Sequence, residues 1–130
     1  MIGVGEVAPA LEATDHRGVR FSLAEARLKG PVVVYFYPRD FTPGCTREAC
    51  LFRDEFPGRD SSAATIVGIS VDDDASHRRF AEHHQLPFSL VSDPDRALAK
   101  RFGIKRPLGL GASRVTFVIE SAFEDGARYY

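Results

Sequence analysis

The chain has 130 residues, with 17 Lys and Arg against 18 Asp and Glu, and a formal net charge of −1 at pH 7. This length fits a single domain, residues 1–130, that buries enough surface to fold without a disulfide or a metal. Because the charges are spread along the chain without basic blocks, the composition argues against nucleic acid or an anionic membrane as a partner.

The N-terminal segment, MIGVGEVAPALEATDHRG, has neither the basic start nor the continuous apolar stretch of a secretion signal. No apolar run in the sequence approaches the roughly 20 residues that span a bilayer. We therefore expect a soluble, cytoplasmic protein. In a reducing cytosol, two cysteines five residues apart are more often catalytic or redox-sensing than permanently crosslinked.

The apolar pattern predicts a hairpin followed by alternating strands and helices. Residues 10–23 form the hairpin, with DHRG as its turn. The continuous run VVVYFY, Val32–Tyr37, is typical of a central strand buried on both faces. Three later apolar runs predict further strands at residues 65–71, 88–92 and 114–119.

Helices are expected between these strands. Residues 44–56 and 76–86 carry apolar side chains at helical spacing, whereas 93–104 begins with acidic capping residues and ends at Gly103. This order predicts an α/β fold whose sheet has a parallel core and helices on both faces. In such folds reactive groups gather near the carboxyl ends of the strands.

The chain's only cysteines, Cys45 and Cys50, lie in the segment YFYPRDFTPGCTREAC, at the end of the predicted central strand. They could be core residues, a structural disulfide, metal ligands or reactive thiols. Cys45 is expected in the opening turn of the next helix, where unpaired backbone N–H groups and the helix dipole favour an anion such as a thiolate. We therefore expect Cys45 to be substantially ionised at neutral pH.

Ionisation alone cannot make Cys45 react fast. An ordinary thiol is already about 3% thiolate at pH 7, so full ionisation gains at most about 30-fold, and other groups must stabilise the transition state. The Thr42 hydroxyl can reach the sulfur or an oxygen atom bound to it, and Pro43 stiffens the loop that carries Thr42. Arg114, at the start of the last predicted strand, is the best-placed fixed cation.

Cys50 is expected on the same helix as Cys45. In an ideal helix, five residues separate the two Cα atoms by about 8.7 Å, whereas disulfides rarely tolerate more than about 7 Å. The pair therefore cannot close unless the first turn or two of the helix unwinds. This geometry favours a cycle in which Cys45 is oxidised to a sulfenic acid, Cys50 condenses with it, and an external dithiol restores both thiols.

Metal and dinucleotide binding are disfavoured by the pattern. The CxxC pairs of zinc sites are absent. The chain's four histidines are His16, His77, His83 and His84. His77 and His84 could share a helix face, but the charged residues between them predict a solvated helix surface. The run DDD, residues 72–74, is interpreted as helix capping, and GLGAS, residues 109–113, as a flexible loop that delivers Arg114.

Pro38, Thr42 and Cys45 form the pattern Pro-x-x-x-Thr-x-x-Cys, which resembles the peroxiredoxin active-site motif. The segment DFTPGCTREAC, with Cys50 five residues after Cys45, is similar to the bacterioferritin comigratory protein or peroxiredoxin Q group. The similarity continues through VVVYFYP, IVGISVDD, SHRRFAEHHQLPFSLVSDPDRALAKRFGI and RVTFVI, and it covers most of residues 5–120.

This resemblance implies a thioredoxin-like fold with a central mixed sheet, and reduction of hydrogen peroxide and organic hydroperoxides to water or alcohol. It implies a peroxidatic Cys45, a resolving Cys50, and a surrounding pocket formed by Thr42, Arg114 and Pro38. Thioredoxin or a similar dithiol is the implied reductant, and no metal, haem or flavin cofactor is expected. Glu48 falls at a position that often supports the hydrogen bonds of this pocket.

Members of the family usually continue after the TFVI strand into another strand and a closing helix, whereas this chain stops at Tyr130. We therefore expect the C-terminal helix to be missing. The surface that it would cover is then exposed, covered by Tyr129 and Tyr130, or covered by a second subunit. The expected state is a monomer or a weak homodimer.

Two other functions could use the same cysteines. A redox sensor or binding protein would signal through them without efficient turnover, but it has no need of Thr42, Pro43 and a cation at a strand end. A disulfide oxidoreductase of the thioredoxin type is disfavoured because such enzymes place two residues between their cysteines, and this chain places four.

Overall fold

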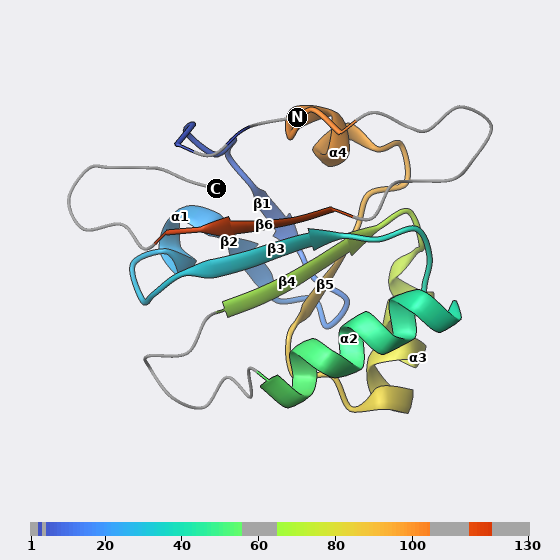
Figure 1. Cartoon of the computed structure of the whole chain (residues 1–130). Helices are drawn as coiled ribbons and strands as arrows, with labels where there is room; N and C mark the ends of the chain where they lie inside the picture. Colours follow the sequence, from blue (N-terminus) through green and yellow to red (C-terminus); the bar gives the residue numbers. More distant parts are fainter. Residues whose placement is uncertain (1–2, 4, 56–64, 105–114, 121–130) are drawn as a thin grey trace.

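The computed structural model describes residues 3, 5–55, 65–104 and 115–120, and within them it shows a mixed sheet with helices on both faces (Figure 1). The elements in chain order are β1 (Glu12–Thr14), β2 (Arg20–Ser22), α1 (Leu23–Ala26), β3 (Val32–Phe36), α2 (Pro43–Glu55), β4 (Thr65–Ser70), α3 (Asp74–His84), β5 (Ser89–Ser92), α4 (Ala97–Arg101) and β6 (Val115–Ile119). The predicted α/β fold, its N-terminal hairpin and the parallel core of its sheet are confirmed.

Strand β3 lies inside the main sheet, whose strand order is β5-β4-β3-β6. It pairs in parallel with β4 and antiparallel with β6, and β4 pairs in parallel with β5. All five residues of β3 are buried, because successive side chains of a strand point to opposite faces and both faces of this sheet are covered. The continuous apolar run that predicted a central strand therefore reflects burial on two sides.

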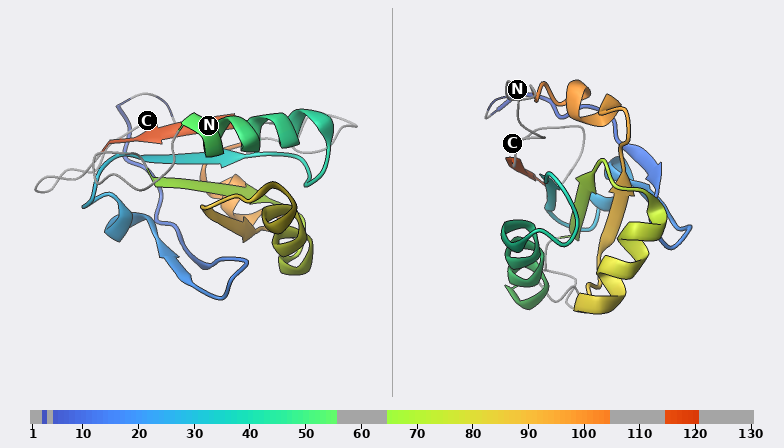
Figure 2. Two further views of the ribbon diagram at one scale, coloured as in Figure 1. Left: turned by 90° about the horizontal axis from the view of Figure 1, so that it is seen from below. Right: turned by 90° about the vertical axis from the view of Figure 1, so that its right-hand side faces the viewer.

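Each face of the sheet is covered by different elements (Figure 2). Val33, Tyr35 and Tyr37 belong to the core beneath α2 and α3, which also contains the side chain of Cys45. The alternate residues of β3 belong to a second core, which includes Leu11 and Phe21 of the hairpin region and residues of α4. Cys45 therefore packs on the face of the sheet that α2 and α3 cover.

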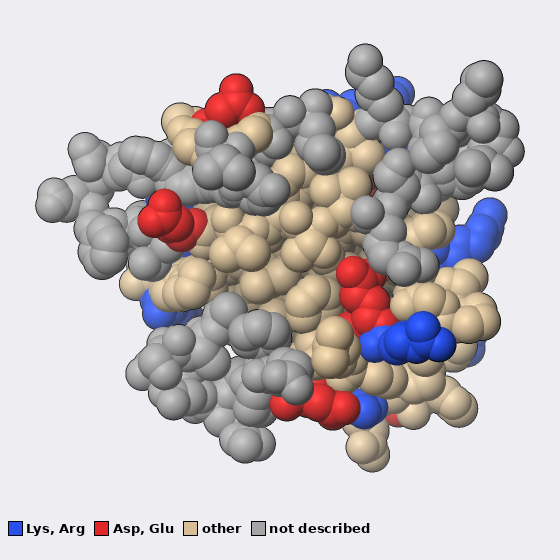
Figure 3. Space-filling model, viewed as in Figure 1, with Lys and Arg blue, Asp and Glu red and all other residues tan. Residues whose placement is uncertain are grey.

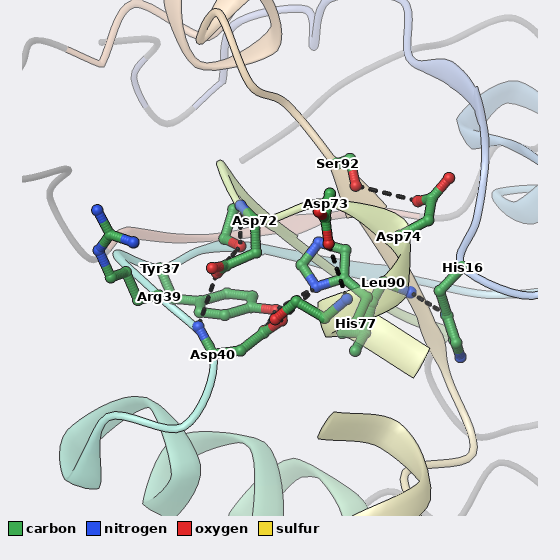
Figure 4. Close-up of polar contacts among 12 residues, drawn as sticks. His16, Tyr37, Arg39, Asp40, Asp72, Asp73, Asp74, His77, Leu90 and Ser92 are labelled. Atoms are coloured by element: carbon green, nitrogen blue, oxygen red, sulfur yellow. Dashed lines mark hydrogen bonds and ion pairs between the residues drawn. The ribbon is translucent and has the colours of Figure 1, made fainter. Parts of the chain in front are cut away.

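The hairpin of β1 and β2 is attached to the edge strand β5 through its turn. The backbone N–H of His16 donates to the carbonyl of Leu90 at 3.0 Å, and the N–H of Leu90 donates to Nδ1 of His16 at 3.2 Å (Figure 4). The neighbouring Asp15 carboxylate accepts hydrogen bonds from Arg17, Val19 and Ser89. His16 therefore acts as a structural link between the hairpin and the sheet.

Two details differ from the sequence prediction. Helix α1 was not predicted; it is a single turn, capped by the Ser22 hydroxyl, which accepts from the N–H of Glu25 at 3.3 Å. Helix α4 begins after Arg96, whose φ is positive, and the Asp93 carboxylate accepts from the backbone N–H groups of the first turn. An acidic residue thus caps α4 as predicted, from a position before the helix rather than at its formal start.

On the face seen in Figure 3, the described charged side chains surround an uncharged centre and form no broad patch of one sign. Among the helices in the described part of the chain, none has the length and apolar character needed to cross a bilayer.

The contact between Gly68 of β4 and the ring of Tyr35 provides a test of this packing. A Cβ added at Gly68 would lie 2.8 Å from Cζ of Tyr35, closer than carbon atoms approach. We expect Gly68→Ala to destabilise the fold by about 1–3 kcal/mol, because the buried ring must shift in a close-packed core. Urea unfolding measures this change.

Gly3→Ala is the matched control for that substitution. Its added Cβ would meet only the Glu6 carboxylate at 3.5 Å, an ordinary contact. Equal stabilities of the two variants would contradict the packing described here.

Candidate active site

Cys45 and Cys50 lie on the same uninterrupted helix, α2, as the sequence predicted. Cys45 is the third residue of this helix, which follows β3 after a short connection, and its side chain is 1% exposed. Cys50 is half-buried, and both are free thiols. The structure therefore shows the reduced arrangement, in which an intact helix holds the two sulfurs apart.

The start of α2 is shaped by Thr42 and Pro43. The carbonyl of Thr42 accepts the first helical hydrogen bond, from the N–H of Thr46 at 2.8 Å. Pro43 is the first helical residue, where proline is favoured because no N–H is needed there. The Thr42 hydroxyl donates to the carbonyl of Arg39 at 3.2 Å, so a contact between Thr42 and the sulfur of Cys45 stays a prediction.

The connection between β3 and α2 is held by a buried carboxylate, that of Asp40 (Figure 4). One oxygen accepts the Tyr37 hydroxyl at 2.6 Å, and the other accepts the Ser76 hydroxyl at 2.8 Å and lies 2.8 Å from Nδ1 of His77. The side chains of His77 and Asp40 are 0% and 1% exposed. These contacts join the end of β3 to the first turn of α3.

The backbone of the same connection is also fixed. The N–H of Asp40 donates to the Asp72 carboxylate at 2.7 Å, and the Ser70 hydroxyl donates to the same carboxylate at 2.8 Å. Since Ser70 ends β4 and Asp72 follows it, the loop before Cys45 is tied to the neighbouring strand as well as to α3.

Phe41 makes the sharp turn that follows Asp40. Its φ is +66°, in the left-handed region that costs a residue other than glycine about 1–3 kcal/mol. Its ring packs edge-on against Phe80 of α3, with 5.0 Å between the centroids. The strained turn is therefore held on both sides, by the Asp40 hydrogen bonds and by the Phe80 ring.

The surroundings of Asp40 keep its carboxyl group ionised. Burial alone would raise the pKa of Asp40, but the hydrogen bonds from His77, Tyr37 and Ser76 and the charge of His77 hold that pKa below its usual value. Burial also raises the pKa of Tyr37 well above its usual value, so its hydroxyl remains a donor. An ionised carboxylate only accepts hydrogen bonds, and Nδ1 of His77 therefore carries the proton between them.

The prediction that His77 and His84 lie on a solvated helix surface is wrong. His77 is fully buried against Asp40, and His84 is half-buried. His77 stands three residues before Phe80 and four before Ala81, so it continues the buried stripe of α3. This spacing could have identified His77, whereas the charged neighbours Arg78 and Arg79 wrongly suggested exposure.

Two other residues named in the sequence prediction lie near the cysteines. Pro38 is half-buried just after β3, and Glu48 is half-buried on α2 between the two cysteines. Arg114 lies outside the described residues, as do residues 109–113 of the loop that was expected to deliver it. The run at residues 72–74 has the predicted capping role, because the Asp73 carboxylate accepts from the N–H of Ser76 at 2.8 Å.

Comparison with known proteins connects this arrangement to one family. The sequence profile of the AhpC/TSA family matches residues 4–123. The chloroplastic peroxiredoxin Q of Populus jackii is 42% identical over 120 residues, which are 92% of this chain and 56% of that protein. The chain therefore spans little more than half the length of this curated relative.

Solved structures give the same result. Peroxidoxin BcpB of Mycobacterium tuberculosis superimposes with a TM-score of 0.83 at 37% identity, over 93% of this chain and 80% of that one. The bacterioferritin comigratory protein of Xanthomonas campestris, whose structures were used to study its alkyl peroxide reduction activity, gives a TM-score of 0.74 at 36% identity. That match covers 85% of this chain and 74% of that one.

The Asp40 carboxylate is expected to contribute to stability above the pKa of a free aspartate, about 3.9. Because its pKa is lowered in the folded state, the contribution is present above that value and is lost as the pH falls through the folded-state pKa. We expect Asp40→Asn to lower the free energy of unfolding by about 3 kcal/mol at pH 7, and the difference from the unmodified chain to shrink below about pH 4.

Urea unfolding between pH 7 and pH 3 measures this difference. The matched control is Asp95→Asn, since Asp95 is exposed and only caps the N–H of Ala97; it should cost no more than about 1 kcal/mol. A difference between Asp40→Asn and the unmodified chain that stays constant down to pH 3 would contradict the role of the ionised carboxylate.

Proposed function

Because the chain belongs to the AhpC/TSA family, in its peroxiredoxin Q and Bcp group, we propose that it is a peroxidase that reduces hydrogen peroxide and organic hydroperoxides through Cys45. The observation that carries this proposal is the position of two free thiols, five residues apart, on the helix that follows the central strand. The alkyl peroxide reduction activity of the Xanthomonas campestris relative supports the substrate class.

In the first step the Cys45 thiolate attacks the terminal oxygen of the peroxide. The S–O bond forms as the O–O bond breaks, and the leaving oxygen takes up a proton and departs as water or an alcohol. Cys45 is thereby oxidised to a sulfenic acid and the peroxide is reduced. Cys45 lies in the opening turn of α2, where the first backbone N–H groups have no helical partners and can stabilise the negative charge that moves onto the peroxide oxygens.

We assign the surroundings of the peroxide to three residues. The Thr42 hydroxyl and the Arg114 guanidinium bind the peroxide oxygens in the transition state, where the breaking O–O bond gains negative charge. Pro38, just after the carboxyl end of β3, forms part of the pocket around the peroxide. Hydrogen bonds that are stronger in the transition state than in the ground state provide the acceleration that thiol ionisation alone cannot.

In the second step Cys50 attacks the sulfenic acid of Cys45, which forms an intramolecular disulfide and releases water. Since an intact α2 keeps the two Cα atoms about 8.7 Å apart, the first turn of the helix unwinds before this step. An external dithiol such as thioredoxin then reduces the disulfide and returns both thiols. Such a cycle suits a reducing compartment such as the cytoplasm, where it contributes to redox homeostasis.

A coupled assay tests this function. Hydrogen peroxide consumption is linked to NADPH oxidation through thioredoxin and its reductase, with the intact chain and with Cys45→Ser. We expect steady turnover by the intact chain and none above background with Cys45→Ser, because that variant has no nucleophile. Absence of turnover by the intact chain, despite a reactive Cys45, would favour the redox sensor.

The role of Cys50 requires a separate measurement. We expect Cys50→Ser to consume one equivalent of peroxide per chain and then stop in the thioredoxin-coupled assay, because its sulfenic acid has no resolving partner. A single-turnover measurement with dimedone labelling detects the trapped sulfenic acid. Normal steady turnover by Cys50→Ser would exclude Cys50 as the resolving cysteine.

A further inference from the structure

Cys50 lies beside a histidine of the neighbouring helix. Its Sγ is 3.8 Å from Nδ1 of His84, the last residue of α3, although the two residues are 34 positions apart in the sequence. Both side chains are half-buried. The catalytic cycle described above gives this imidazole no part.

His84 is held in this position by several contacts. Its carbonyl accepts a hydrogen bond from Nη1 of Arg53 at 2.7 Å, so the third turn of α2 is attached to the end of α3. The His84 ring packs edge-on against Phe80 at 5.2 Å and lies 6.3 Å from the ring of Phe41. The imidazole is therefore oriented before any reaction at Cys50.

We propose that His84 is the general base of the resolving step, accepting the proton of the Cys50 thiol as its sulfur attacks the sulfenic acid of Cys45. This inference rests on the proposed function. The S–S bond forms while the S–O bond of the sulfenic acid breaks, and the leaving hydroxide takes the proton from His84 and departs as water. His84 returns to its neutral form, so the step needs no further oxidant or reductant.

The electrostatics of His84 suit a base that works at neutral pH. Burial, with the charges of His83 and Arg53, lowers its pKa below the usual value of a histidine, so the ring is neutral and free to accept a proton. The charged or titratable groups around it are Cys50 and Arg53 on α2, Asp54, which pairs with Arg53 at 2.9 Å, and His83 on its own helix.

Contacts of α2 near Cys50 indicate which part of this helix stays in place during the resolving step. The bond from Arg53 to His84, and the packing of the Phe52 ring on Tyr35 at 4.8 Å, attach the part of α2 around Cys50 to α3 and the sheet. Unwinding of the first turn therefore brings Cys45 to Cys50, while Cys50 keeps its place beside His84. A general base must stay within reach of the proton that it removes, and this arrangement meets that condition.

The test compares disulfide closure in the full chain, His84→Asn and His84→Phe after addition of one equivalent of hydrogen peroxide. Rapid quenching between pH 6 and pH 10 follows the sulfenic acid by dimedone labelling and the disulfide by mass. We expect sulfenic acid to form at unchanged rates in all three proteins. At pH 7 closure should slow at least about 10-fold in both variants, since an unassisted thiol is only about 3% ionised there.

The pH profile separates a base from a structural role. In both variants the closure rate should rise with pH and approach that of the unmodified chain near pH 10, where a thiol ionises without help. Glu82→Gln is the matched control, because Glu82 is an exposed residue of the same helix, two positions before His84, and it should close within about twofold of the unmodified rate. His84→Phe keeps an aromatic ring against Phe80, so a loss shared with His84→Asn does not come from packing.

Three outcomes would overturn the inference. Equal closure rates at pH 7 would remove His84 from the step, and a reduction of the same size at every pH would make its role structural. Both leave the peroxidase proposal intact, because sulfenic acid still forms. Failure of the unmodified chain to form any sulfenic acid would overturn the proposed function together with this inference.

Discussion

The position of Cys45 depends on the hydrogen bonds of one buried carboxylate, that of Asp40. An ionised carboxylate inside a protein is costly unless several donors satisfy it, and here Tyr37, Ser76 and His77 do so. These donors come from the end of β3 and from the first turn of α3. Because separating this charge from its donors costs free energy, the chain up to Asp40 is attached to the sheet and to α3, and this sets where α2 begins and where Cys45 lies in the reduced structure.

Helix α3 supports the site at both of its ends. His77, Phe80 and His84 are three and then four residues apart, so they form one stripe along the helix. The first of them contacts the Asp40 carboxylate, the second packs against Phe41, and the third reaches the sulfur of Cys50. One helix face therefore positions the segment before Cys45 and the surroundings of Cys50.

In the proposed cycle, the helix that carries Cys45 also keeps it from Cys50. An intact α2 holds Cys45 in its N-terminal turn, but it separates the two Cα atoms beyond the reach of a disulfide. The proposed cycle thus needs a helix that is stable when reduced and opens locally after oxidation, as functional segments of low local stability do. In the described structure the later turns of α2 are attached through Arg53 and Phe52, so in the proposed cycle the first turn is the part that opens.

The sequence by itself determined the features that depend on neighbours along the chain. A continuous apolar run marked β3, apolar side chains at helical spacing over residues 44–56 marked α2, and the spacing of Cys45 and Cys50 excluded a disulfide within an intact helix. Only the tertiary structure decided which polar side chains meet across the fold: Asp40 and His77 are 37 residues apart, and Cys50 and His84 are 34 apart. The spacing of His77 from Phe80 and Ala81 indicates the buried side of α3. Which group the imidazole meets there depends on what packs against the helix, and local sequence does not contain that information.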